Sequence, residues 1–439
     1  MTTLKVFRFW LPLALAWLLM STESAWIQGV ISRKPDAETQ LAAFGLMFSL
    51  SVLIETPIIM LLATSNALSR DRQSFRLLWR FMMSINILIS AIAVLIAFTP
   101  LLDLYLGTLL NVPPHIVDAT RPGMKIMVLW GAFIGYRRFH QGVIIRFGKT
   151  RYVGFGTLIR VLVSGSVAMG LGAITNLAGI QVGAFALILS TSAEAVYTYC
   201  VSRPDVKRLL ETPRPPSKPP LSYSQATRFH LPLAATSLIT LLVHPVIERG
   251  LAGMSEPTQS LAAWPIILSI VWFMRAGGMA YQEVVISLND NERNHRLLRN
   301  FTLRLGFGLS LIMLLFAGTP LVQIYLSVIL GVATDLQALV IAGAQAAFLL
   351  PLLTTLHSYL RALLMLSNRT AAIYQAITLG FAVTAIVVWG GIALGLHGIL
   401  AASLGLTLGQ IFELAYLVLA YKRGKAALRL HWQSAIATT

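Results

Sequence analysis

Several ionisable residues of this sequence stand inside long apolar stretches. A charge at the centre of a membrane helix costs about 2.5–3.5 kcal/mol on insertion scales, so such residues usually face a bundle interior or a water-filled cavity. Guanidinium and imidazole groups lining such a cavity are suited to binding phosphate or carboxylate. The candidate anion-binding residues are Arg137, Arg138, His140, His244, Arg275, His357 and Arg361.

The acidic residues of the apolar stretches fall into two groups. Glu23, Glu55 and Glu283 are candidates for coupling to H⁺ or Na⁺, because a desolvated carboxyl group can exchange a proton near neutral pH. Glu194 and Glu413 occupy matching places near the ends of the two sequence halves. We expect this second pair to hold helices together rather than to bind substrate.

Motifs of enzymes and metal sites are missing. The sequence has no GxxxxGK[ST] phosphate loop and no HExxH zinc motif, so a nucleotide would be cargo rather than fuel. Its single cysteine, Cys200, excludes an internal disulfide and a cysteine metal cluster. We therefore predict a protein that is not an enzyme and has no cofactor or metal.

The composition is that of a membrane protein. Of 439 residues, 56% are hydrophobic and 12% are charged, whereas soluble domains carry roughly 25% charged residues. Apolar runs of about 20 residues, the length that spans a bilayer as a helix, recur along the chain. We predict an all-α polytopic membrane protein with about twelve transmembrane helices. The fourth of them is expected at residues 123–145, and Arg160 in the fifth is expected to extend toward the membrane surface.

The net charge of +17 reflects topology. Most Lys and Arg residues outside the expected spans lie on one side, and by the positive-inside rule that side is cytoplasmic. Both termini then lie in the cytoplasm, and the protein is a multi-pass protein of the inner membrane. We expect contacts with membrane lipids and no nucleic-acid partner, and we expect a monomer. Residues that carry the bias include Arg70, Arg72, Arg76, Arg80, Arg146, Lys149 and Arg151.

The sequence repeats itself once. FWLPLA from Phe9 returns as FHLPLA from Phe229, and Thr99-Pro100-Leu101 returns as Thr319-Pro320-Leu321. A near-constant offset that contains six spans leaves both halves in the same orientation, as in one class of secondary transporters. The predicted domains are a six-helix bundle at 1–202, a proline-rich cytoplasmic linker at 203–228, a second six-helix bundle at 229–421 and a cytoplasmic tail at 422–439.

Three stretches resemble a known family. DAETQLAAFGLMFSLSVLIETP from Asp36 to Pro57, the start of the seventh span through His244-Pro245, and the last span through Glu413 are similar to the progressive ankylosis family. That family belongs to the superfamily of multidrug, oligosaccharidyl-lipid and polysaccharide (MOP) exporters. The resemblance implies a MATE-like fold of two pseudosymmetric six-helix bundles and the export of pyrophosphate or organic anions.

These patterns favour a secondary exporter of small organic or phosphate-bearing anions, of the citrate, ATP or pyrophosphate class, that alternates access between two bundles. Two alternatives come from the same superfamily: a flippase for lipids or lipid-linked oligosaccharides, and a multidrug antiporter. A flippase also needs basic residues, since its lipid carries pyrophosphate, whereas a carrier of cationic drugs needs a net acidic cleft. A further alternative is a membrane scaffold without transport, in which the intramembrane charges pair with one another.

Overall fold

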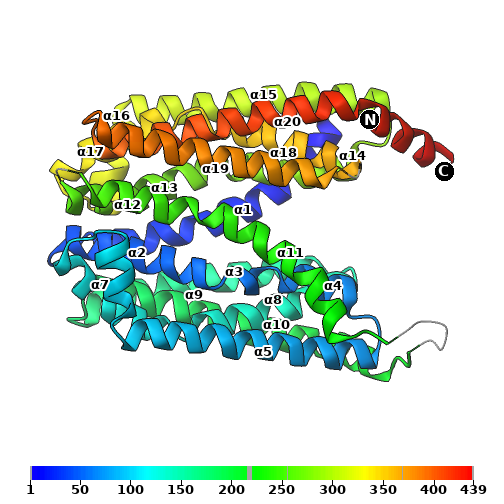
Figure 1. Cartoon of the computed structure of the whole chain (residues 1–439), viewed down its shortest axis with the longest axis horizontal. Coiled ribbons are helices and arrows are strands. Elements are labelled where there is room, and N and C mark those ends of the chain that lie inside the picture. Colours follow the sequence, from blue (N-terminus) through cyan, green and yellow to red (C-terminus); the bar gives the residue numbers. More distant parts are fainter. Residues whose placement is uncertain (1, 215–219, 255, 368, 438–439) are drawn as a thin grey trace. The chain divides into compact units, whose positions relative to one another are not determined.

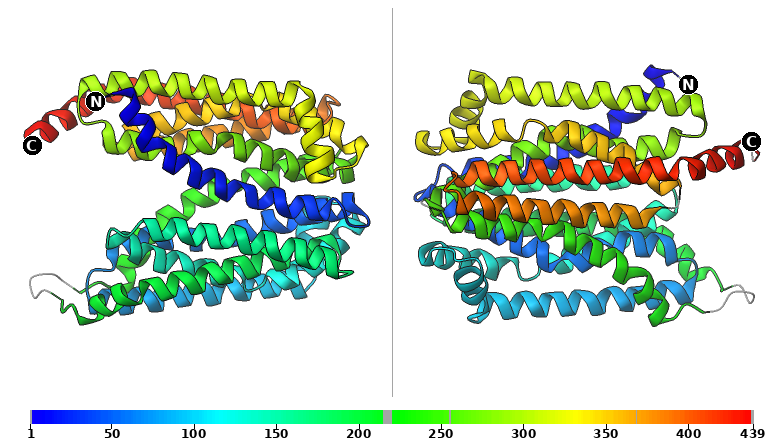
Figure 2. Two further views of the ribbon diagram at one scale, coloured as in Figure 1. Left: turned by 180° about the vertical axis from the view of Figure 1, so that it is seen from behind. Right: turned by 45° about the horizontal axis from the view of Figure 1, so that its top comes forward.

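The computed structural model describes residues 2–214, 220–254, 256–367 and 369–437, and this part of the chain is helical, with no strand. Figure 1 shows the helices coloured along the sequence, and Figure 2 gives two further views of them. By length and composition, ten helices in the described residues can cross a membrane, or eleven if one bent pair counts as a span. The protein is thus a multi-pass membrane protein.

In chain order the helices are α1 Thr3–Ile31, α2 Ala37–Ile54, α3 Thr56–Ile59, α4 Leu61–Leu68, α5 Arg72–Phe98, α6 Leu101–Asp103, the π-helix η1 Leu104–Leu109, α7 Pro114–Met127, α8 Trp130–Arg146, α9 Arg151–Ile174, α10 Gly179–Glu211, α11 Tyr223–Leu241, α12 Val243–Ala252, α13 Pro257–Met279, α14 Tyr281–Leu288, α15 Glu292–Gly318, α16 Pro320–Ile324, the π-helix η2 Tyr325–Leu330, α17 Thr334–Ala346, α18 Leu350–Leu366, α19 Thr370–Ala393 and α20 Gly398–Ala437.

The number of apolar spans is slightly lower than the predicted twelve. The predicted fourth span at 123–145 corresponds to α7 and α8, which break at Val128 and Leu129. This pair is not among the helices apolar enough to cross a membrane, because α8 carries Arg137, Arg138 and His140. Instead of facing lipid, much of α8 is buried and packs against α4 and α10.

Both sequence halves build the same series of elements. The long helices α5 and α15 are each followed by a short helix and a π-helix. Beyond the π-helices, Asn111 and Gly331 occupy equivalent positions and both adopt left-handed backbone, with φ of 57° and 67°. Asparagine and glycine are the residues that tolerate this conformation best. Each half then ends in a pair of neighbouring helices, α9 with α10 and α19 with α20. The predicted pseudosymmetry is therefore present in the element order.

The described helices pack into two compact units. The N-unit is Trp26–Ala252, and the C-unit is Met1–Ala25 together with Gly253–Thr439. This division differs from the predicted bundles at the first helix of each half. In the C-unit, Trp10 of α1 donates a hydrogen bond from its indole to the carbonyl of Gly277 over 2.8 Å. At the equivalent place in the N-unit, His230 of α11 is 2.8 Å from the hydroxyl of Thr64.

The segment after the last helix of the N-unit is more ordered than predicted. The sequence places a linker from residue 203, but α10 continues through Pro204 to Glu211. The extension is held because Asp205 pairs with Lys149 over 2.7 Å and Leu209 is 2% exposed. Likewise, α20 continues through most of the predicted tail, to Ala437. Residues 215–219 of the predicted linker and 438–439 of the tail lie outside the described residues.

Helix breaks occur where charged residues enter the core of the N-unit. The span formed by α2, α3 and α4 breaks at Glu55 and again at Met60. Pro57 accounts for the first break, since a proline ring clashes with the carbonyl four residues before it. The break places the Glu55 side chain, which is 3% exposed, inside the unit.

Candidate functional site

A buried ion-pair cluster lies inside the N-unit, where α8 packs on α10. Arg137, which is 4% exposed, donates through Nη1 to Oε2 of the fully buried Glu194. One helical turn further along α8, Gln141 donates to Oε1 of Glu194 over 3.0 Å. On α9, Nε of Arg160 is 3.9 Å from Oε2 of Glu194. This glutamate therefore joins three helices.

The environment of Arg160 corrects one sequence prediction. Its side chain is 13% exposed, so the expectation that it extends to the membrane surface is wrong. A carboxylate within ion-pair distance offsets much of the cost of burying a guanidinium group. Spacing along α9 did not reveal this partner, because Glu194 comes from the next helix of the chain.

Arg138 follows Arg137 on α8 but has a different environment. Its Nε is buried, and its side chain has no hydrogen bond or ion pair within the described residues. Adjacent residues of a helix point about 100° apart, so only one of the two arginines can reach Glu194. Among the candidate arginines of the N-unit, Arg138 is thus the one that no described carboxylate contacts directly.

Glu55 lies close to this basic pair. Its Oε1 is buried and has no hydrogen-bond partner in the described part of the chain, while Arg137 and Arg138 both interact with it electrostatically. A cavity of about 10 Å³ beside it is lined by Ser51, Met124 and other residues. That volume is close to the smallest space that holds one water molecule.

The remaining basic candidate on α8 makes a local contact. Nδ1 of His140 is 2.7 Å from the hydroxyl of Ser202 on α10. The ring of His140 also packs against Tyr136, with centroids 4.6 Å apart, and against Tyr199 at 5.5 Å. His140 therefore lies in an aromatic environment between α8 and α10, and its described contacts do not include Glu194.

The C-unit contains the counterpart of the first cluster. Glu413 on α20 accepts from Arg361 of α18, and its Oε1 is 3.7 Å from Nε2 of His357. His357 occupies the place of Arg137, and Arg361 that of Gln141. Nδ1 of His357 is 2.6 Å from the carbonyl of Leu353. The guanidinium partner of the glutamate has thus moved by one helical turn between the two units.

Among the candidate anion-binding arginines, Arg275 is the second that no described carboxylate contacts. Its Nε donates to the hydroxyl of Thr354 on α18 over 2.5 Å, and its side chain forms no ion pair within the described residues. Arg361 and Glu413 act on it electrostatically from further away. Arg275 occupies the place in the C-unit that Glu55 occupies in the N-unit, so the two units carry opposite charges at this position.

The structure places the other candidates separately. Glu23 on α1 is 7% exposed, Glu283 on α14 is exposed, and His244 on α12 is half-buried. Sequence reasoning missed Gln141 and Thr354, the neutral partners of Glu194 and Arg275. The one-turn spacing between Arg137 and Gln141, repeated as His357 and Arg361, could have indicated the first of them. No group of three or more metal-ligating side chains was found in the described residues.

No family model and no curated protein matches the chain. Solved structures do match. A multidrug resistance MATE family transporter of the MOP superfamily, in an inward-facing conformation, has a TM-score of 0.70 at 15% identity over 96% of this chain and 99% of that one. The chain has the MATE-like fold of the MOP superfamily. This confirms the predicted fold class.

Two further structures share the MOP fold with this chain. Lipid II flippase MurJ, in an inward closed conformation, has a TM-score of 0.67 at 12% identity, covering 97% of this chain and 91% of that one. A MOP superfamily transporter from Pyrococcus furiosus has a TM-score of 0.61 at 14% identity, covering 96% of each. Identities this low establish the fold alone, and one MOP fold serves different cargoes. The resemblance to the progressive ankylosis family stays a prediction.

Proposed function

We propose that this protein is a secondary membrane transporter that works by alternating access. The support is its MOP fold, which is found in a MATE family transporter in both inward-facing and outward-facing conformations. The bias of Lys and Arg residues supports placement in the inner membrane with both termini in the cytoplasm. That the substrate passes between two bundles stays a prediction from the sequence.

The proposed substrate is a small organic or phosphate-bearing anion, and one observation carries this choice. Among the predicted anion-binding arginines, one in each unit has no carboxylate in contact within the described residues: Arg138 in the N-unit and Arg275 in the C-unit. An arginine at membrane depth normally needs a counter-charge. An anionic substrate would supply it, and the planar guanidinium group binds carboxylate or phosphate through two parallel hydrogen bonds.

This proposal divides the predicted anion-binding residues into two groups. Arg137 and Arg361 are engaged by Glu194 and Glu413, so we assign them to holding helices together. His357 lies beside Glu413 and belongs with them. Arg138 and Arg275 are assigned to the substrate. Export of an anion is favoured by an inside-negative membrane potential, which contributes about 2.3 kcal/mol per exported charge per 100 mV.

Glu55 is the candidate for coupling. Its oxygen without a partner and the small cavity beside it would allow one proton or a small cation to bind. Glu283 is exposed and is less suited to that role. Binding of a proton at Glu55 would change the field at Arg138, since the two interact electrostatically, and this would link proton and substrate binding.

Two alternatives follow from the neighbours. Lipid II flippase MurJ has the same fold, and a flippase substrate with a pyrophosphate group would also require basic residues. The MATE neighbour is named as a multidrug resistance transporter. Transport of a cationic drug fits this chain less well, because Arg138 and Arg275 are themselves cations. The Pyrococcus furiosus protein is said to have a binding pocket of reversed polarity that suggests a different function, so a change of polarity within this fold has a precedent.

The test is flux in proteoliposomes. Purified protein would be reconstituted with labelled citrate, ATP or pyrophosphate inside, with a labelled lipid-linked sugar and a cationic dye in parallel arms. We expect efflux of at least one anion, reduced about tenfold or more in Arg138→Gln and in Arg275→Gln, since a charge-assisted hydrogen bond contributes about 1.5–3 kcal/mol. Arg304→Gln, at an exposed position of α15, is the matched control. Unchanged efflux in both variants would remove the site, and lipid or dye movement without anion efflux would replace the function.

A further inference from the structure

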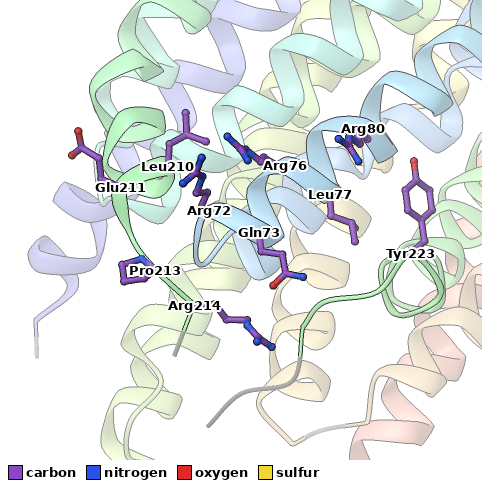
Figure 3. A pocket seen from close by; sticks show the side chains of 10 residues that line it. All are labelled: Arg72, Gln73, Arg76, Leu77, Arg80, Leu210, Glu211, Pro213, Arg214 and Tyr223. Carbon is purple, nitrogen blue, oxygen red and sulfur yellow. The ribbon is translucent and has the colours of Figure 1, made fainter. Parts of the chain in front are cut away.

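A basic pocket opens at one end of the N-unit, apart from the buried charges described above. It has a volume of about 540 Å³ and is lined by α5, by the segment that follows α10 and by Tyr223 at the start of α11. Figure 3 shows Arg72, Arg76 and Arg80 following one another along α5, with Arg214 on the segment beyond α10. Among the described residues that line it, Glu211 is the one acid.

Three of these arginines lack protein partners. Arg72, Arg76 and Arg80 are exposed, and within the described residues their side chains form no hydrogen bond or ion pair. Their four-residue spacing brings them to one face of α5, where like charges one turn apart repel each other by about 0.2–0.5 kcal/mol per pair. Glu211 forms no ion pair with them in the described residues, and its carboxylate is 3.9 Å from Lys207. The pocket therefore concentrates positive charge that an external anion would neutralise.

The matching helix of the C-unit lacks this feature. At the equivalent place α15 has Glu292 instead of Arg72 and Asn300 instead of Arg80. The arginine equivalent to Arg76 is kept as Arg296, which donates to Glu292 over 2.6 Å; α15 also carries Arg293, Arg299 and Arg304 at other positions. At these three positions α15 thus carries one paired arginine, whereas α5 carries three that form no ion pair within the described residues. The difference points to a role for the unpaired arginines.

The walls of the pocket are fixed by specific contacts. The backbone N–H of Arg72 donates to the carbonyl of Thr212 over 3.0 Å, which ties the segment after α10 to α5. The Tyr223 hydroxyl is 3.0 Å from that of Ser84, and its ring lies 5.6 Å from that of Phe81. Segments that are distant in sequence are thus held together around one pocket.

The level of the pocket fits the headgroup layer of a bilayer. The exposed apolar side chains of α5 begin at Trp79 and resume at Ile87, which is about 10 Å along the helix from Arg80 at 1.5 Å per residue. Trp is enriched where a membrane helix meets the interface. Arg72 and Arg76 therefore precede the first exposed apolar side chain of α5, and Arg80 follows directly after it. The lining residues Leu77 and Leu210 add apolar surface beside them.

We propose that this pocket binds the phosphate group of an anionic amphiphile, held by Arg72, Arg76 and Arg80. The group recognised is a phosphate ester. Because the pocket lies beside the apolar surface of α5, a phospholipid headgroup is favoured over a dissolved phosphate compound. A lipid bound here would fix the start of α5 against the segment leaving α10. The site is independent of substrate binding by Arg138 and Arg275.

Binding would be tested on the full-length protein in detergent, with fluorescent phosphatidylglycerol as ligand and phosphatidylcholine of the same chains as the neutral comparison. We expect tighter binding of phosphatidylglycerol, and binding about tenfold or more weaker in Arg76→Gln/Arg80→Gln, since each basic residue contributes about 1 kcal/mol at such a surface. Arg76→Lys/Arg80→Lys should retain most of the affinity. Arg296→Gln, which removes a charge at the equivalent place on α15, should retain all of it.

Glycerol 3-phosphate and inorganic pyrophosphate would be added as competitors to separate the two sources of phosphate. Weak competition assigns the site to lipid, and competition as strong as that of phosphatidylglycerol assigns it to a soluble phosphate compound; both outcomes support a phosphate site. Equal binding by the wild type and Arg76→Gln/Arg80→Gln would overturn it, as would an equal loss in Arg296→Gln. Melting temperatures of all variants would confirm that the exposed substitutions leave the fold intact.

Discussion

Glu194 and Glu413 occupy equivalent positions on α10 and α20. Each accepts a hydrogen bond from an arginine guanidinium group, on α8 and α18 respectively, but from a different helical turn. Arg137 supplies it in the N-unit, while Arg361, one turn further along, supplies it in the C-unit. The other position of each pair holds Gln141 or His357, within 3.0 Å and 3.7 Å of the same glutamate. The same ion pair is thus built in two registers.

This relationship predicts that the arginine of the N-unit can be moved by one turn. Arg137→His alone removes the guanidinium group that donates a hydrogen bond to the buried Glu194 and leaves Arg160 at 3.9 Å. Breaking a buried pair costs about 3–5 kcal/mol. We expect Arg137→His to lower the melting temperature sharply, and Arg137→His/Gln141→Arg to recover much of the loss, because that double variant reproduces the arrangement of the C-unit. Thermal unfolding in detergent is the measurement.

The control for this exchange is Gln141→Arg alone, which adds a cation next to Arg137 and should destabilise the protein. A double variant no more stable than Arg137→His would show that the one-turn register is fixed by packing around α8 and not by the charge of Glu194. The comparison isolates the coupling between the two positions, as in any double-mutant cycle.

A second prediction concerns the hydroxyl that holds Arg275. Thr354→Val removes the acceptor of the 2.5 Å hydrogen bond from Arg275 Nε while changing side-chain volume little. We expect the KM for the anion to rise several-fold with a smaller change in maximal flux, because Arg275 keeps its charge but loses its orientation. Concentration-dependent efflux from proteoliposomes measures both quantities.

Thr378→Val on α19 is the matched control, since the Thr378 hydroxyl is exposed and donates to the Tyr374 carbonyl of its own helix over 3.0 Å. Its KM should equal that of the wild type. If Thr354→Val leaves the KM unchanged as well, the orientation of Arg275 does not matter for transport, and its assignment to substrate loses support.

A third prediction tests the helical extension of α10. Asp205 is fully buried and receives Lys149 over 2.7 Å. Asp205→Ala removes this pair and should destabilise the end of the N-unit, which limited proteolysis would detect as faster cleavage after α10. Lys207→Ala is the control, because Lys207 is exposed and its carboxylate partner is 3.9 Å away. Equal cleavage of the two variants would mean that Leu209 and its neighbours hold the extension without the ion pair.

The sequence predicted the fold and the equivalence of the two halves because both depend on patterns along the chain. Apolar runs of membrane length and a constant offset identified the helices and matched Arg137 to His357 and Glu194 to Glu413. Which cation contacts which acid depends on the rotation of α8 and α9 against α10. Composition does not encode that rotation. For this reason the sequence does not predict that Arg160 and Gln141 lie beside Glu194.

The basic pocket could not be predicted for the same reason. In the sequence, the bias of basic residues explains Arg72, Arg76 and Arg80 by topology alone. The structure adds that these three form no ion pair in the described residues, whereas Arg296 of α15 is paired. Pro204 also favoured a linker, since proline removes one backbone hydrogen bond of a helix. The contacts of Asp205 and Leu209, which outweigh that loss, come from tertiary packing.

The last prediction concerns coupling through Glu55. If a proton on Glu55 links the gradient to substrate movement, Glu55→Gln, which stays neutral at every pH, should transport the anion at a rate that no longer responds to an imposed pH difference. The residual flux should still respond to membrane potential, because the charge of the anion is unchanged. Efflux would be measured with a pH difference and with a potassium diffusion potential in separate arms.

Glu283→Gln is the matched control and should keep the response to pH, since Glu283 is exposed on α14. Loss of that response in Glu283→Gln with retention in Glu55→Gln would move the coupling role out of the N-unit, and a Na⁺ dependence retained in both variants would assign coupling to a site that contains neither carboxylate.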